Sequence, residues 1–140
     1  MATFTKVNTF ALALGQKKHN LASDQLKVAL TNTDPTASAS IYTDITAPLD
    51  NTNLSGATPF NITTTSWTQT GGLASLVLAD LVLTASGGNT ASFRYVAIYN
   101  DTATNDELIG YYDYGASTTI TDGNTFTIDF TDLQTLLTIQ

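Results

Sequence analysis

The feature that most constrains the fold is a series of short segments in which apolar and polar residues alternate, separated by turn-forming residues. Residues 26–31 alternate and then break at Asn32–Pro35, and the segment 60–70 is closed by Gly71-Gly72. Alternation with period two is the pattern of a half-buried strand, and threonine, which is β-branched and fills 27 of 140 positions, favours strands over helices. The series predicts an all-β protein: an antiparallel β-sandwich, jelly-roll or Ig-like, with one short N-terminal helix or arm.

The other segments extend this prediction. Residues 73–85 are nearly continuous in apolar side chains, which is typical of a central strand buried on both faces. Ser86–Asn89 predicts a hairpin of Gly-Gly type. Within 125–130 we expect phenylalanine and isoleucine to face inward, and the alternate residues Thr125, Thr127 and Asp129 to face water. Further strands are expected at 91–99, 107–114, 118–121 and 136–139, and a long loop at 33–58 with a short edge strand near Ile41–Ile45.

The N-terminal segment differs from the rest in pattern and in charge. Residues 9–19 predict the one helix, since alanine and leucine propagate helices and lysines suit the C-terminal end. We therefore divide the chain into an arm or short helix, 1–22, and a single sandwich domain, 23–140. Four lysines against Asp24 give residues 1–27 a net charge of +3, while eleven acids against Arg94 give residues 28–140 a net charge of −10. Two interpretations stay open: solvated lysines, or a basic arm that docks on an acidic partner or a neighbouring copy.

Composition excludes several classes of protein. The chain has no cysteine, so it has neither a disulfide framework nor a thiolate metal site. A net charge of −7 argues against binding to nucleic acid and against a polybasic membrane contact. The first residues lack the charged and apolar regions of a secretory signal, and we expect the chain to fold in a cytosol or to leave it by another route.

The sequence predicts no catalytic residue, cofactor or metal site. His19 is the only histidine and is expected at the surface or at a helix end. Asp106 and Glu107 are adjacent and would point to opposite faces of a strand, while Asp129 and Asp132 lack a partner acid or base. The loop 100–107 has oxygens enough for calcium but not the spacing of a twelve-residue calcium loop.

The aromatic side chains leave three alternatives open. Packing in the core, a protein interface and a platform for sugar rings would each use tyrosine and tryptophan. The residues concerned are Trp67, Phe93, Tyr95, Tyr99, Tyr111, Tyr112 and Tyr114.

Several segments carry a resemblance to a known group of proteins. They are 6–10, 18–21, 23–33, 93–102, 108–115, 126–130 and 137–139, with sequences such as SDQLKVALTNT and FRYVAIYNDT. Together they resemble small virion structural proteins of tailed bacteriophages, in particular head decoration, or cement, proteins. Residues 33–70 have no counterpart in this resemblance. Where those relatives have acidic residues in the first helix, this chain has Ala11, Ala13 and Gly15.

The resemblance implies a non-enzymatic capsid decoration protein that binds and stabilises the outer capsid lattice. Its expected partners are the major capsid protein and copies of itself, in a virion assembled in the bacterial cytoplasm. A strongly acidic body would be repelled by packaged DNA and belongs outside the shell. The expected capsid contacts lie in the N-terminal arm: Phe4, Lys6, Phe10, Leu14, Lys17 and Lys18. The alternative is a module of the tail tip or fibre that binds host glycan or receptor.

Overall fold

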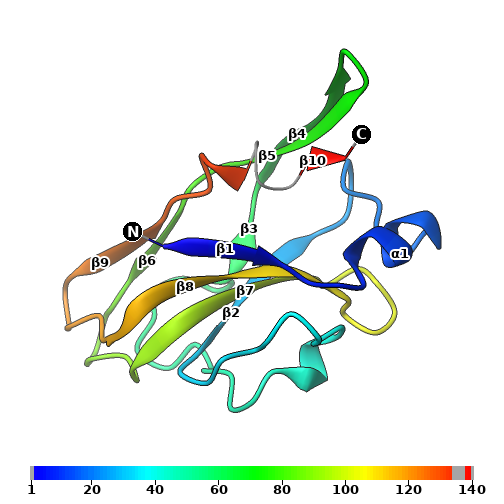
Figure 1. Ribbon diagram of the computed structural model, residues 1–140. Coiled ribbons are helices and arrows are strands. Elements are labelled where there is room, and N and C mark those ends of the chain that lie inside the picture. The colour runs from blue at the N-terminus through cyan, green and yellow to red at the C-terminus, as the bar shows by residue number, and fades with distance from the viewer. Residues whose placement is uncertain (1, 134–137, 140) are drawn as a thin grey trace.

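Two antiparallel β-layers make up the protein, as predicted (Figure 1). The computed structural model describes residues 2–133, 138 and 139. One layer is a five-stranded sheet of order β1-β8-β7-β2-β3; the other comprises β10-β5-β4 and the pair β6-β9. The elements are β1 (Thr3–Lys6), α1 (Phe10–Gly15), β2 (Leu26–Thr31), the 3-10 helix η1 (Tyr42–Asp44), β3 (Asn61–Ile62), β4 (Thr64–Thr70), β5 (Leu73–Leu78), β6 (Leu81–Thr84), β7 (Phe93–Asn100), β8 (Leu108–Thr118), β9 (Thr125–Ile128) and β10 (Thr138–Ile139).

The centre of the five-stranded sheet is covered on both faces. Consecutive residues of β2, Val28, Ala29 and Leu30, are all buried, although neighbouring side chains in a strand point to opposite faces. The loop 32–60 lies over the outer face and buries Ala39 and Ile45 (Figure 1). The edge strand expected near Ile41–Ile45 is instead η1, because the Asp44 carboxylate accepts hydrogen bonds from the backbone N–H of Ser40 and of Ile41. Only Ile41 makes a single bridge, to Glu107.

The second layer corrects two predictions. Residues 73–85 form two strands, β5 and β6, rather than one, with a break at Ala79-Asp80 where the Asp80 carboxylate accepts a hydrogen bond from Phe130 N–H at 3.0 Å. Their apolar run is not buried on both faces, since Leu73 and Val82 are exposed. Ser86–Asn89 is not a hairpin, because β6 pairs with β9 and the chain crosses there to β7 in the other layer. Residues 119–121 are likewise not a strand.

Aromatic rings join the two layers. Phe93 of β7 and Tyr114 of β8 each meet Phe126 of β9 edge-on, with ring centroids 5.2 Å apart. Ile128 and Phe130 are buried while Thr125, Thr127 and Asp129 are exposed, so the predicted alternation is confirmed. Of the last predicted strand, the structure describes Thr138–Ile139, which pairs with β5, whereas 136 and 137 lie outside the described residues.

The N-terminal segment is built into the sandwich instead of standing apart as an arm. Strand β1 pairs with β8 at the edge of the main sheet, with Thr3 opposite Asp113. Val7, Phe10 and Leu21 are buried in the same core as the strands. The structure therefore shows no separation at the boundary that we drew after residue 22, because these apolar side chains complete the hydrophobic core.

Helix α1 is confirmed but is shorter than the predicted span 9–19. It ends at Gly15, and the N–H groups of Lys17 and Lys18 then return to the carbonyls of Leu14 and Ala13. This pair of bonds is a Schellman motif, which needs a left-handed residue at the position now held by Lys17, whose φ is 62°. The turn stops the helix before His19.

Candidate functional site

The six predicted contact residues do not form one surface. Phe10, the first residue of α1, is fully buried on the inner face of the helix and is therefore excluded as a contact with a partner. Phe4 is half-buried and packs on Tyr112, with ring centroids 5.1 Å apart. Lys6 is the last residue of β1 and is not among the residues that line the hollow beside Leu14 and Lys17.

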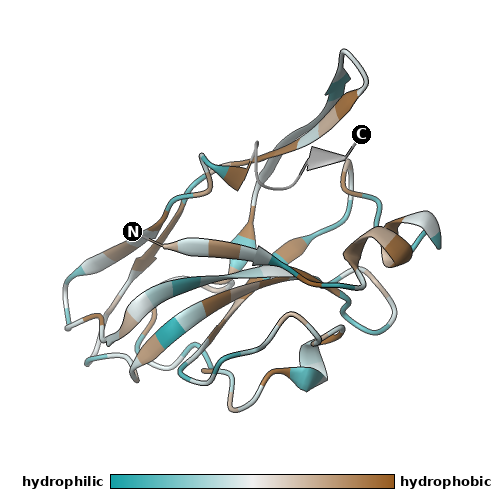
Figure 2. Ribbon diagram, viewed as in Figure 1, coloured by the Kyte–Doolittle hydropathy of each residue, from teal (hydrophilic) through white to brown (hydrophobic). Residues whose placement is uncertain are grey.

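That hollow lies between the end of α1 and the hairpin formed by β4 and β5. It has a volume of about 390 Å³ and is lined by Leu14, Lys17, His19, Asn20, Leu21 and Trp67. On another side of α1, Leu12 is 61% exposed, the most exposed of the large apolar side chains among the described residues. We call these two neighbouring features together the α1 surface: the exposed Leu12 on one side of α1, and Leu14, Lys17 and Trp67 of the hollow on the other. Figure 2 shows α1 as an apolar element at one end of the molecule.

Sequence reasoning missed Leu12 and Trp67 as members of this surface. Leu12 alternates with Phe10 and Leu14, so the pattern alone does not show which of the three faces solvent. The helix shows which residue faces solvent. Phe10 and Ala13 are three residues apart, so both lie on the buried face of α1, and Leu12 points away from it.

Half of the four lysines in residues 1–27 are neutralised by ion pairs within the chain. Lys18 forms an ion pair with Glu107 at 3.2 Å, and Lys27 one with Asp101 at 3.0 Å. The same loop, 100–107, supplies both acids. Among the described residues, Lys6 and Lys17 are the cationic side chains that make no ion pair, so Lys18 is a poor candidate for a partner contact.

Of the two predicted positions for His19, the surface or a helix end, the surface is wrong: His19 is buried, four residues after the last residue of α1. The hydrogen bonds around the ring indicate which nitrogen carries the proton. The side-chain oxygen of Asn100 accepts hydrogen bonds from the N–H groups of Thr102 and Ala103. Its NH₂ group therefore faces Asp24, at 2.6 Å, and the Nδ1 of His19, at 3.1 Å. Because that NH₂ can only donate, Nδ1 must accept, and the imidazole proton sits on Nε2.

This arrangement leaves His19 no role as a base. Nδ1 is occupied by Asn100, and the buried Nε2, which carries the proton, has no hydrogen-bond partner in the part of the chain that is described. Burial lowers the pKa of His19, and the nearby carboxylates of Glu107 and Asp24 only partly oppose that effect. The group acts as a neutral structural link between the end of α1 and the loop 100–107.

The carboxylates that the sequence analysis considered lie at two separate places. Glu107 is bound by Lys18, which lowers its pKa against the effect of burial, while burial and neighbouring acids raise the pKa of Asp106. Asp129 and Asp132 do converge: both line a hollow of about 250 Å³ together with Ala2, Tyr112, Tyr114 and Thr131. The Tyr112 hydroxyl donates to Asp132 at 3.0 Å. Among residues 2–133, 138 and 139, no three acids or histidines are grouped as a metal site would require.

Most of the tyrosines pack within the protein. Tyr95, Tyr111 and Tyr112 are buried. Tyr99 is half-buried against Tyr42, with ring centroids 4.8 Å apart. Burial, helped by nearby Asp129 and Asp132, raises the pKa of Tyr114 to about 12. Packing within the protein thus accounts for five tyrosines: Tyr42, Tyr95, Tyr99, Tyr111 and Tyr112. Trp67 and Tyr114 keep part of their rings at hollows on the surface, and the buried Tyr112 borders the hollow of Tyr114.

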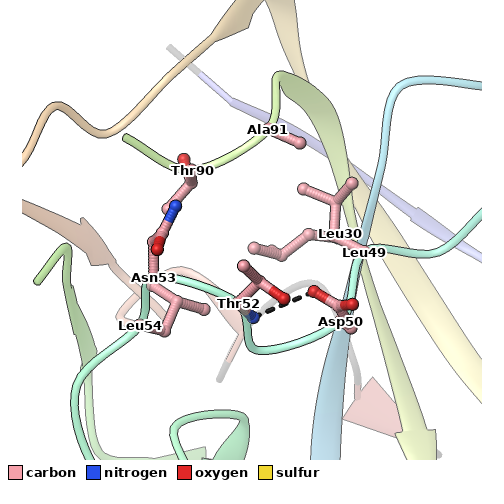
Figure 3. A pocket seen from close by; sticks show the side chains of 8 residues that line it. All are labelled: Leu30, Leu49, Asp50, Thr52, Asn53, Leu54, Thr90 and Ala91. Carbon is pink, nitrogen blue, oxygen red and sulfur yellow. Dashed lines mark hydrogen bonds between the residues drawn. The ribbon is translucent and has the colours of Figure 1, made fainter. Parts of the chain in front are cut away.

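A further cavity lies at one end of β2, under the loop 49–54 (Figure 3). Its volume is about 270 Å³, and it is lined by Leu30, Leu49, Asp50, Thr52, Asn53, Leu54, Thr90 and Ala91. Asp50 is its one titratable group, and hydrogen bonds from Thr52 lower the pKa of that carboxyl. A single ionised carboxylate at a largely apolar cavity offers contacts for a ligand but no acid–base pair.

Comparison of the chain with models of known protein families, with curated proteins and with solved structures gave no match. Within the described ranges, no helix is long and apolar enough to cross a membrane.

Proposed function

We propose that this protein is a non-enzymatic structural component of a phage virion, a decoration protein that binds the outer capsid lattice. The observation that carries the proposal is the α1 surface. It sets an outward leucine, Leu12, and a cation without an ion pair, Lys17, at one end of a body with a strong negative charge. Such a surface suits the major capsid protein as partner, since apolar contact supplies affinity and charge supplies orientation.

The action we assign to the protein is stabilisation by mass action. A protein that binds the assembled lattice more tightly than free subunits raises the stability of the lattice in proportion to the logarithm of its free concentration. The acidic body then faces outward, away from packaged DNA.

Copy number in purified virions tests the proposal. Quantitative mass spectrometry of particles that contain this protein should give a copy number comparable to that of the major capsid protein. A handful of copies per particle, or absence from virions, contradicts decoration.

The contact itself is tested by single substitutions. Removal of residues 1–22 would also remove β1 and three core side chains, so loss of binding by that fragment would say nothing about docking. Leu12→Glu is expected to abolish co-sedimentation with capsids and to leave the fold intact, because the side chain is in solvent. Val82→Glu is the matched control, since Val82 is 54% exposed on β6, and it should bind normally.

A second candidate function is glycan binding at a tail tip or fibre. The observation in its favour is the hollow that combines the rings of Tyr112 and Tyr114 with the carboxylates of Asp129 and Asp132, the side-chain types that hold sugar rings and their hydroxyls. It predicts saturable binding of the isolated protein to glycans, lost in Tyr114→Ala, and few copies per virion.

A further inference from the structure

Strand β4 is an open sheet edge with little protection: its register with β5 is irregular only between Thr64 and Ser66, and from Ser66 to Thr70 the strand is regular. It is the terminal strand of its sheet and, with seven residues, the longest of the edge strands that the structure describes. Edge strands are commonly guarded by charged side chains or proline, which prevent pairing with another chain. Strand β4 has neither, and no residue from 51 to 79 is charged.

The other edges are short or guarded. Strand β1 has four residues and ends in Lys6, and β9 has four residues between Asp122 and Asp129. Strand β3 has two residues, β10 has two and β6, which directly follows Asp80, has four. The β4–β5 hairpin also projects beyond the rest of the molecule, which leaves room for a partner beside β4 (Figure 1).

The geometry of the hairpin identifies the free backbone groups. Gly71 and Gly72 both have positive φ, 60° and 86°, as a two-residue type I′ turn requires. Thr70 and Leu73 are then a hydrogen-bonded pair, and such pairs alternate along the ladder. Thr68 is therefore bonded to β5, while the N–H and C=O groups of Trp67 and Gln69 point outward.

We propose that β4 pairs antiparallel with β4 of a second copy of this chain. The partner we choose is a second copy, on the ground of charge. Two chains of net charge −7 repel each other where their acidic parts meet, whereas contact of β4 with β4 brings no acidic side chains together. A two-fold contact needs one self-complementary strip, which β4 provides. Trp67, half-buried in the monomer, lies at the centre of β4 and adds apolar area to the pair.

Sedimentation of the full chain over a range of concentrations tests the proposal. The wild type should form a dimer, and Gln69→Pro should be monomeric because it removes an outward N–H without breaking a bond to β5. Gln69→Lys keeps the backbone intact and should likewise be monomeric. Gln16→Lys adds the same charge just after α1 and should dimerise. A monomeric wild type, or a dimeric Gln69→Lys, overturns the proposal.

Two further readouts are specific to this edge. Trp67 is the sole tryptophan, so its fluorescence should shift to shorter wavelength as concentration rises, in the wild type but not in Gln69→Lys. When outward Trp67 of one copy lies opposite outward Gln69 of the other, Thr68 lies opposite Thr68 at the two-fold axis. Because the chain has no cysteine, Thr68→Cys should therefore form an intermolecular disulfide under mild oxidation, whereas Thr3→Cys on the edge strand β1 should not. These experiments need no capsid, so the pairing and the decoration function fail or succeed separately.

Discussion

At the scale of single residues, the conformation of Lys17 is the least expected feature. The Schellman turn after α1 places this lysine in the left-handed region, where glycine is the usual residue because a side chain there is strained. The sequence pattern showed a glycine two residues earlier, at Gly15, and so did not locate the end of the helix.

Replacement of Lys17 should therefore stabilise the fold. We expect Lys17→Gly to raise the free energy of unfolding by about 0.5 kcal/mol, since relief of left-handed strain exceeds the entropy that glycine adds to the unfolded chain. Urea denaturation measures this. Lys17→Ala removes the charge but keeps the strain and should change stability little; an equal gain in that variant would contradict the explanation.

His19 makes stability depend on pH in a definite direction. Its pKa is lowered in the folded protein from an ordinary value of 6.5, so below that pH the unfolded chain binds a proton that the folded chain does not. The contribution of His19 is therefore complete above pH 6.5 and declines as the pH falls from there toward the lowered pKa of the folded state.

Denaturation at a series of pH values checks this prediction against a variant. His19→Asn retains an acceptor for Asn100 but does not titrate, so the loss of stability between pH 6.5 and 5 should be smaller in His19→Asn than in the wild type. Parallel curves for the two proteins would show that titration of groups other than the imidazole causes the slope, and would contradict the prediction.

At the scale of elements, the pairing of β1 with β8 depends on one glycine. A Cβ at Gly110 would lie 2.4 Å from the Phe4 ring and 2.6 Å from the carbonyl oxygen of Thr5, so no larger residue fits without moving β1. The alternation within residues 107–114 predicts the strand but not this close approach, because the neighbour is supplied by the far end of the chain.

Two Gly→Ala substitutions should have opposite effects. Gly110→Ala is expected to lower the free energy of unfolding by about 3 kcal/mol, through the clash with β1. Gly15→Ala meets nothing within 4 Å and should raise it by about 0.5 kcal/mol, since alanine is the better helix former. Urea midpoints of both variants decide this, and a mild effect at Gly110 would mean that β1 is easily displaced.

At the scale of the whole molecule, the sequence predicted the features that depend on local patterns and missed those that depend on long-range contacts. The bounds of β2, Leu26–Thr31, and the turn at Gly71-Gly72 follow from alternation and glycine, both of which are local. The break between β5 and β6 depends on a hydrogen bond between Asp80 and Phe130, fifty residues away, and does not show in an apolar run. The proposed site was missed for the same reason, since Trp67 and Leu14, which line one hollow, are brought together only by the fold.

The affinity of the proposed dimer should depend on salt concentration, because both copies carry a net negative charge. Two copies of charge −7 repel each other, and ions screen that repulsion over a Debye length of about 10 Å at 0.1 M. The dimer through β4 should therefore strengthen as salt is raised, as sedimentation would show. An interface held by ion pairs, such as Lys17 with an acid of the second copy, would weaken instead.

The pairing of β1 with β8 also sets an order of events during synthesis. Thr3 can pair with Asp113 only after residue 113 has been synthesised, whereas the pairing of β4 with β5 joins residues close in sequence and can begin once Leu78 has left the ribosome. The uncharged edge is thus formed while the sheet that gives each copy its core is still open. Neighbouring nascent chains on one messenger could meet through it before either chain is finished.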